Sequence, residues 1–270
     1  MTQQNGYRRE DNHFLAYDAI RAYEPRADGS IDMGGLARYF ELAANLASAA
    51  SGFSPQWYKD RGEGWVIRDQ SIDLRGVARS GEPIRMETWV KSYSRVSAVR
   101  DYILTSETDG HIIGAGSATW AYIQRDEQSL QRIPEEIARA IPVAPGSATD
   151  PAHKLRRIST EVLLGNPLLF TARRYESDQM QHINNCVYVD WVCEAATIAA
   201  AQQNDKSGSL RDAQIERLEI AYLRSAKSGD IVAVTAYLSE NVADRASLYI
   251  EALDYATGEK FVAAQVFFRR

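Results

Sequence analysis

Residues 178–185 place several polar side chains directly before a long apolar segment. The tract reads Asp-Gln-Met-Gln-His-Ile-Asn-Asn, so that a carboxylate, Asp178, comes four residues before an imidazole, His182. Asn184 and Asn185 follow, and either side-chain oxygen can cap a helix by accepting a free backbone N–H group. The first turn of a helix also carries partial positive charge and unpaired N–H donors. A carbonyl oxygen or an oxyanion could bind to such donors.

These residue types fit the hydrolysis of an activated acyl group. A carboxylate beside a histidine can fix the tautomer of the imidazole, raise its basicity, or activate water itself. A purely structural explanation also exists for each residue. His182 could pack into a strand–helix turn, Asp178 could stabilise that turn, and the asparagines could serve only as caps. Their combination at the start of one helix favours a functional site.

Other catalytic motifs are missing from the sequence. It contains no Gly-x-Ser-x-Gly elbow, no phosphate-binding loop and no cluster of Cys and His with metal-ligand spacing. We therefore expect no cofactor and no metal. The pair Gly114 and Gly116 lies in a predicted strand, where close packing is the better explanation. Cys186 and Cys193 are expected to be core residues of one helix, about 10 Å apart along its axis and thus too distant for a disulfide.

Composition and charge narrow the class of protein. The chain has 270 residues, 45% of them hydrophobic, and a net charge of −5, which argues against a general nucleic-acid binder. The N-terminal residues do not resemble a signal peptide, and no apolar run approaches the roughly 20 residues that cross a bilayer. With two cysteines that cannot pair, we expect a reduced, cytoplasmic protein that does not bind membranes.

The tract with the polar residues lies in the second of two similar halves. The segments that begin at Ala78 and Ala226 read Ala-Arg-Ser-Gly-Glu and Ala-Lys-Ser-Gly-Asp, and they lie 148 residues apart. Two later hairpin turns keep the same spacing, and alignment of the helices on Tyr39 and Tyr188 gives 149. Three landmarks at one spacing indicate a tandem repeat, of which only the second copy carries the polar tract.

Each half shows the same order of elements, a short strand, a long helix and then four strands. Residues 13–20 and 33–51 are the predicted strand and helix of the first half, followed by strands at 64–74, 83–96, 99–108 and 112–124. The second half has a strand at 169–175, a helix at 185–203, and strands at 214–223, 231–240, 245–254 and 260–269. One helix before a run of antiparallel strands predicts the α+β class. We expect repeats at 1–140 and 167–270, with a proline-containing linker at 141–166 between them.

The pattern Asp178-x-x-x-His182-Ile-Asn-Asn-x-x-Tyr188-x-x-Trp191-x-x-Glu194 resembles the signature of acyl-acyl carrier protein thioesterases. The strand that begins Gly64-Trp-Val-Ile is similar to a strand of the same family, so the resemblance covers nearly the whole chain. It implies a double hotdog fold, in which each of two tandem sheets wraps around a helix. It also implies a thioester hydrolase that releases free acid from an acyl carrier protein in fatty-acid or polyketide metabolism.

The chain departs from the family pattern at three positions. Asp178 and His182 match the catalytic positions, but Met180 stands where the family has an asparagine. Ser225 and Ala226 stand where the family has glutamate and cysteine. In the family, the asparagine and glutamate help to bind and activate water, which methionine cannot do. Hydrolysis could therefore be slower, or the pocket could serve other chemistry on a carrier-bound acyl chain.

The expected site thus has Asp178 and His182 as catalytic residues, and Asn184, Asn185 and Ser225 around the substrate or oxyanion. Two alternatives stay open, a dehydratase of 3-hydroxyacyl thioesters and a non-catalytic acyl-binding protein. The expected partner is an acidic acyl carrier protein with a phosphopantetheine-linked acyl chain, and the chain acts as a monomer or homodimer. A local basic patch must then offset the net negative charge. Its candidate residues are Arg156, Arg157, Arg173 and Arg174.

Overall fold

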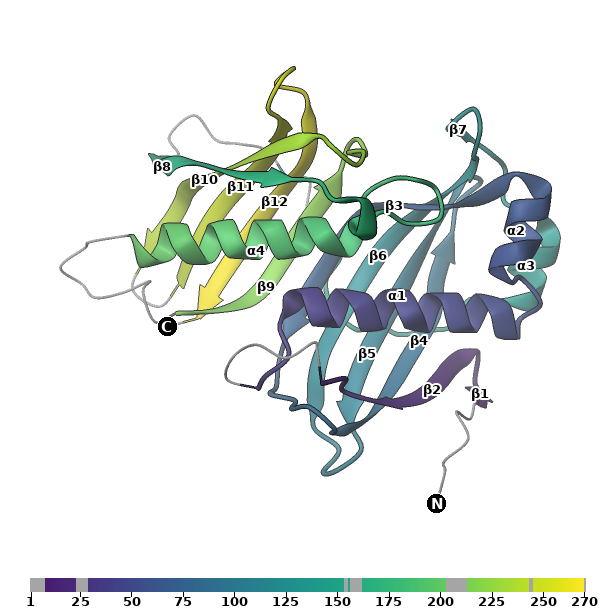
Figure 1. Cartoon of the computed structure of the whole chain (residues 1–270). Coiled ribbons are helices and arrows are strands. Elements are labelled where there is room, and N and C mark those ends of the chain that lie inside the picture. Colours follow the sequence, from purple (N-terminus) through teal and green to yellow (C-terminus); the bar gives the residue numbers. More distant parts are fainter. Residues whose placement is uncertain are drawn as a thin grey trace. The chain divides into compact units, whose positions relative to one another are not determined.

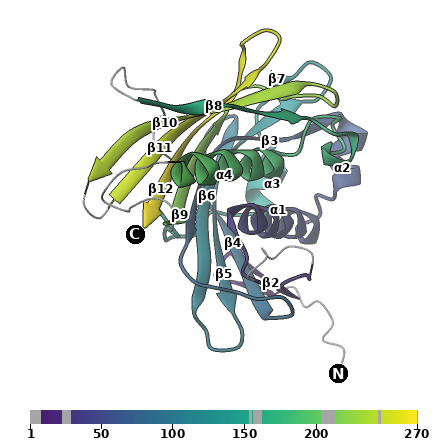
Figure 2. The same ribbon diagram turned by 60° about the vertical axis from the view of Figure 1, so that its left-hand side comes forward.

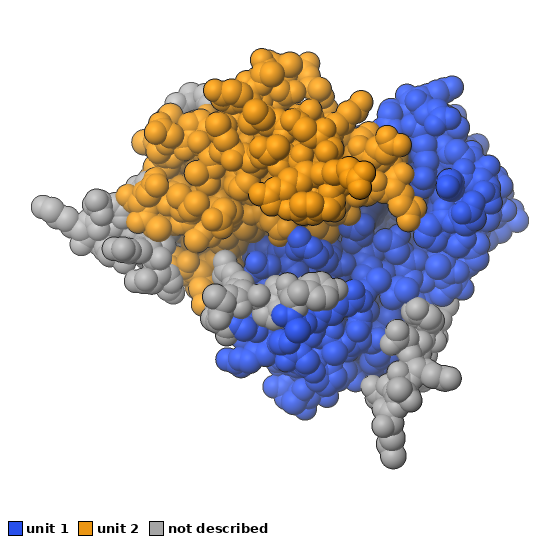
Figure 3. Space-filling model, viewed as in Figure 1, with its two compact units in different colours: residues 1–151 blue, residues 152–270 orange. Residues whose placement is uncertain are grey.

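A computed structural model describes residues 8–22, 29–152, 155, 162–202, 213–242 and 245–269. The chain divides into two compact units, Met1–Pro151 and Ala152–Arg270, which Figure 3 shows in different colours. Each unit contains an antiparallel sheet and one long helix (Figure 1), so the predicted α+β class with two repeats is confirmed. Within the described ranges, no helix is long and apolar enough to cross a membrane.

The first unit has the strand order β1-β2-β4-β5-β6-β3, with β7 paired to β6, and all of these neighbours are antiparallel. Its strands are β1 (Arg8–Glu10), β2 (His13–Ala19), β3 (Glu63–Leu74), β4 (Pro83–Tyr93), β5 (Ser97–Ser106), β6 (Ile112–Gln124) and β7 (Ser129–Leu130). Its helices are α1 (Met33–Ala50), α2 (Pro55–Arg61) and α3 (Glu135–Ala140). The strands β1 and β7 and the helix α2 were not predicted.

Helix α1 lies along one face of the first sheet (Figures 1 and 2). It begins after Asp32, whose side chain accepts a hydrogen bond from the third helical backbone N–H. Two strand glycines allow the close approach. A β carbon added at Gly114 would lie 2.6 Å from Leu36, and one at Gly116 would lie 2.5 Å from Phe40. The prediction that these glycines serve close packing is confirmed.

The second unit has the strand order β9-β12-β11-β10-β8, again antiparallel throughout. Its elements are β8 (Val162–Thr171), the 3-10 turn η1 (Arg174–Glu176), α4 (Asn185–Ala201), β9 (Gln214–Tyr222), β10 (Ile231–Val242), β11 (Arg245–Asp254) and β12 (Lys260–Arg269). Helix α4 packs on this sheet through buried residues, among them Val187, Trp191 and Ala195. These three residues recur at four-residue spacing, so they form one apolar face of the helix.

The first strand of the second unit differs from the prediction. Strand β8 starts at Val162, whereas the predicted strand covers 169–175. Pro167 is tolerated because β8 is the last strand in the order of its sheet. It also falls within a register shift opposite β10, two residues after Gly165, whose φ is +69°. Residues after Thr171 instead form the turn η1.

The segment predicted as a linker is divided between two different structures. Its last residues belong to β8, and its first residues cross the sheet of the first unit. There the N–H of Ala144 donates to the carbonyl of Val90 at 2.9 Å. The N–H of Ala148 donates to a carboxylate oxygen of the fully buried Asp101, also at 2.9 Å. This segment is therefore held to the first unit by hydrogen bonds.

Corresponding hydrogen bonds define the relation between the two repeats. Ile31 donates its N–H to the carbonyl of Ala78 at 3.0 Å, and Ile183 donates to Ala226 at the same distance. The acceptors are 148 residues apart, as predicted, but the donors are 152 apart. The helix caps Asp32 and Asn184 are also 152 apart. The predicted alignment of the helices at 149 was therefore wrong by three residues, almost one helical turn.

Candidate functional site

The loop between η1 and α4 is a tight hairpin closed by Asp178. Ser177 and Ile183 form an isolated antiparallel bridge, and the N–H of Asp178 donates to the carbonyl of His182 at 2.8 Å. The carboxylate oxygen Oδ1 of Asp178 accepts from the N–H groups of Met180 at 2.7 Å and His182 at 3.2 Å. One carboxylate oxygen thus organises the loop, while Oδ2 makes no hydrogen bond to the described residues.

The imidazole of His182 is half-buried and makes no hydrogen bond to any residue that the structure describes. The carboxylate of Asp178 accepts a hydrogen bond from the backbone N–H of His182, and no hydrogen bond joins the carboxylate to the imidazole ring. The structure therefore places the two residues in one loop without showing the predicted side-chain pair. Both side chains keep free polar atoms that a water molecule or a substrate could contact.

Asn184 is the N-cap of α4, and Asn185 is the first helical residue. The side-chain oxygen of Asn184 accepts from the N–H of Cys186 at 2.8 Å, and its own N–H donates to the carbonyl of Glu176 at 2.9 Å. The cap thereby occupies one of the donors expected to face an oxyanion. The N–H of Asn185 lies at the helix start and has no acceptor among the described residues. This N–H is the remaining candidate donor to the carbonyl oxygen of a substrate.

Ser225 lies in the loop between β9 and β10 and is exposed. Its neighbour Ala226 is fully buried and fixes this loop to the start of α4. The carbonyl of Ala226 accepts from Ile183, the residue after His182, and its N–H donates to the phenol oxygen of Tyr188 at 2.7 Å. These two bonds bring the loop that carries Ser225 against the hairpin that carries His182.

Two tyrosines of this region, Tyr188 and Tyr222, form hydrogen bonds around the start of α4. Tyr222 donates its hydroxyl to the carbonyl of Asn185 at 3.3 Å, and its ring meets that of Tyr188 edge-on at 6.1 Å. Burial raises the pKa of Tyr188 to about 12, and the charges of Asp230 and Asp178 act in the same direction. Tyr188 is therefore a neutral anchor at neutral pH. Its position one turn after the helix cap was the available signal.

The arginines predicted to form a basic patch are only partly described. Arg156 and Arg157 lie outside the described residues. Arg173 and Arg174 are exposed, but the guanidinium of Arg173 donates to the hydroxyl of Tyr175 and lies 5.8 Å from its ring centre. The backbone N–H of Arg173 also donates to the carboxylate of Glu176. Arg173 thus has a local role in holding η1.

The chain matches two domain families along most of its length. Residues 12–141 match the acyl-ACP thioesterase N-terminal domain, and residues 165–270 match the acyl-ACP thioesterase C-terminal domain. An acyl-[acyl-carrier-protein] hydrolase of Cuphea viscosissima is 25% identical over 188 residues, which cover 66% of this chain and 45% of the relative. Oleoyl-acyl carrier protein thioesterase 2 of Arabidopsis thaliana is 27% identical over 143 residues, 48% of this chain and 38% of the relative. The chain thus matches less than half the length of these two relatives.

Two solved structures share the fold along both repeats. An acyl-ACP thioesterase from Bacteroides thetaiotaomicron superposes with a TM-score of 0.77 at 17% identity, covering 96% of this chain and 98% of that one. A 12:0-ACP thioesterase from Umbellularia californica gives 0.78 at 19% identity, covering 96% and 94%. These likenesses establish the predicted double hotdog fold.

Proposed function

Because the chain belongs to the acyl-ACP thioesterase family, we propose that it hydrolyses the thioester between an acyl group and the phosphopantetheine of an acyl carrier protein. The hairpin at the start of α4 carries this proposal. It brings a carboxylate oxygen, a half-buried imidazole and a free helical N–H together within residues 178–185. The products are a free carboxylic acid and the carrier thiol.

The proposed reaction begins with water held by Oδ2 of Asp178 and the imidazole of His182. The water oxygen attacks the thioester carbonyl carbon while one of these groups takes the proton. Negative charge develops on the carbonyl oxygen, where the N–H of Asn185 and the positive end of α4 stabilise it. The carbon–sulfur bond then breaks, and the proton passes to the departing thiolate. Ser225 contributes a hydroxyl that can hold the water but cannot act as a base near neutral pH.

The proposal also covers the biological setting. The substrate is an acyl carrier protein thioester of fatty-acid or polyketide metabolism, and the reaction takes place in the cytoplasm. The free thiols of Cys186 and Cys193 support a reducing compartment.

A His182→Ala variant tests the site directly. We expect kcat for an acyl carrier substrate to fall by roughly 10²–10⁴-fold, the usual contribution of a general acid–base group. The imidazole contacts no described hydrogen-bond partner, so stability should change little. Gln179→Ala, an exposed position in the same hairpin, is the matched control and should keep wild-type activity.

Product masses decide the reaction type. Free acid supports hydrolysis, whereas an acyl carrier lighter by one water indicates a dehydratase instead. A wild-type protein that binds acyl carriers without turnover contradicts both reactions. Full activity of His182→Ala would remove the imidazole from the mechanism.

A further inference from the structure

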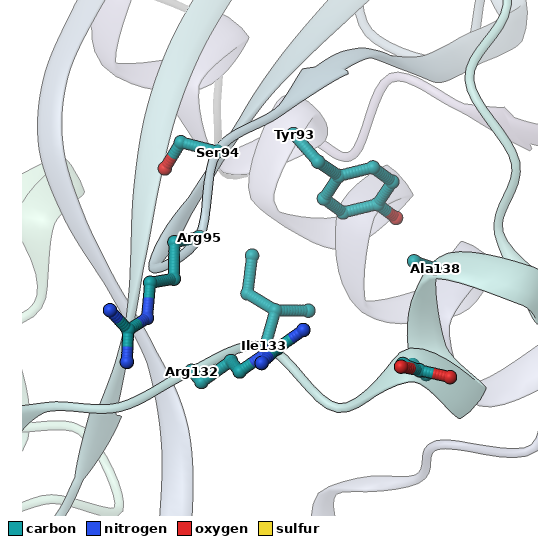
Figure 4. A pocket seen from close by; sticks show the side chains of 7 residues that line it. Tyr93, Ser94, Arg95, Arg132, Ile133 and Ala138 are labelled. Atoms are coloured by element: carbon teal, nitrogen blue, oxygen red, sulfur yellow. The ribbon is translucent and has the colours of Figure 1, made fainter.

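The first unit contains a pocket of 370 Å³. One wall is the turn between β4 and β5, and the other is the segment that leads into α3. Figure 4 shows its labelled side chains, Tyr93, Ser94, Arg95, Arg132, Ile133 and Ala138. The walls are tied together, because the N–H of Ile133 donates to the carbonyl of Arg95 at 3.0 Å. The pocket is therefore preformed.

The two arginines of this pocket carry uncompensated charge. Arg95 and Arg132 are exposed, and neither guanidinium has an ion-pair or hydrogen-bond partner in the described part of the chain. The pocket's acidic residue, Glu135, is paired with Arg139 at 2.8 Å and so does not neutralise them. The pocket therefore presents two positive charges on a chain whose net charge is −5.

The floor between these charges is apolar. Ile133 is buried, and Ala138 is half-buried on α3. Tyr93 is half-buried, packs against a buried apolar cluster and donates its hydroxyl to the carbonyl of Ile141 at 2.8 Å. An apolar centre with tyrosine and arginine at its edge has the composition of an energetically important part of a protein–protein interface.

We propose that this pocket docks the acidic surface of the acyl carrier protein, an inference that depends on the proposed function. Two proteins of net negative charge repel each other unless local charges are complementary. Carboxylates of the carrier pair with Arg95 and Arg132, and an apolar carrier side chain contacts Tyr93 and Ile133. The predicted basic patch at Arg173 and Arg174 is a weaker candidate, because Arg173 already binds Tyr175.

The experiment compares two charge-reversal variants of the full chain. Arg95→Glu/Arg132→Glu alters the pocket, and Arg21→Glu/Arg79→Glu makes the same charge change at exposed arginines elsewhere in the first unit. Binding is measured by calorimetry with a carrier protein that holds its acyl chain through a non-hydrolysable amide. Carrier binding is measured at several salt concentrations. Hydrolysis of a small neutral acyl thioester is measured in parallel.

We expect the pocket variant to bind the carrier at least about tenfold more weakly and with less salt dependence, while the control stays within about twofold. Hydrolysis of the small thioester should be unchanged in both. Equal carrier binding by both variants overturns the docking site. A second outcome also overturns the docking site. In it, the pocket variant still binds the carrier but no longer binds free fatty acid or inorganic phosphate, which the wild type does bind. The pocket would then be a site for a small anion. Because binding uses a stable amide, absent thioester hydrolysis would contradict the proposed function without affecting this result.

Discussion

The phenol oxygen of Tyr188 accepts a 2.7 Å hydrogen bond from the backbone N–H of Ala226. Tyr188 comes from the first turn of α4, and Ala226 follows the exposed Ser225. Both Tyr188 and Ala226 are buried, so the bond is shielded from water. This contact joins the helix that starts at the proposed site to the loop that carries its serine.

Replacement of Tyr188 by Phe should therefore destabilise the protein. The buried N–H of Ala226 would lose its acceptor, which costs about 1–3 kcal/mol. Chemical denaturation of the variant measures this loss. Tyr222→Phe removes a longer bond, 3.3 Å to the carbonyl of Asn185, and should have a smaller effect. Equal stability of wild type and Tyr188→Phe would show that the bond contributes nothing.

The same tyrosine predicts a loss of stability in alkali. Burial raises the pKa of Tyr188 to about 12 from an ordinary value of 10.0. Above pH 10 the unfolded chain releases this proton and the folded chain does not, so stability is complete below pH 10 and declines towards pH 12. The decline attributable to Tyr188 reaches about 3 kcal/mol. Burial also raises the pKa of Tyr102 and Tyr122, which contribute in the same direction.

Denaturation at pH 9 and pH 11, in wild type and in Tyr188→Phe, isolates this contribution. The variant should lose less stability between the two pH values than the wild type does. Parallel pH profiles would mean that Tyr188 ionises freely in the folded protein.

Asp178 accepts the hydrogen bonds that hold the hairpin, and it supplies the carboxylate of the proposed reaction. Two substitutions can separate these functions. Asp178→Asn keeps a side-chain oxygen for the N–H groups of Met180 and His182, so the hairpin should persist. Asp178→Ala removes that acceptor and should cost about 1 kcal/mol of stability, as loss of a comparable cap does. Both should lower kcat by roughly 10²-fold or more, because neither retains the carboxylate. Wild-type turnover by Asp178→Asn would show that the negative charge is not needed.

The glycine contacts of α1 predict a packing defect. In Gly116→Ala the new β carbon would meet Phe40 at 2.5 Å, which should cost about 1–3 kcal/mol. Phe40→Leu made in the same chain should relieve part of that overlap, so the double variant should be more stable than the sum of the two single effects. Thermal unfolding of all four proteins provides the comparison. Additive effects would place the strain somewhere other than at this contact.

Much of the fold could be predicted from local patterns. The strands Ile112–Gln124, Arg245–Asp254 and Lys260–Arg269 have the bounds that alternation and turn residues indicated. Helix α2 was missed although its signals were present. Ser54 caps it by accepting from the N–H of Trp57, and Gly62 ends it in the left-handed conformation. At seven residues it was too short for a periodic apolar face to show.

Other features depend on contacts that sequence patterns do not carry. The three-residue error in aligning the helices arose because similar aromatic residues were matched, whereas the caps Asp32 and Asn184 are the equivalent positions. The residues of the site were identified by type, but their hydrogen bonds were not. The contact of Tyr188 with Ala226 spans 38 residues, and only the folded chain brings them together.

The irregular backbone at Gly165 and Pro167 has a consequence for solubility. Strand β8 is the last strand in the order of its sheet, and its Leu163 and Leu169 are 54% and 56% exposed. A straight apolar strand of this kind would invite pairing with other polypeptides. The register shift leaves at most four consecutive residues of β8 aligned with β10. Pro167 has no N–H to donate to an added strand. Fibril-like growth through this strand is thus discouraged.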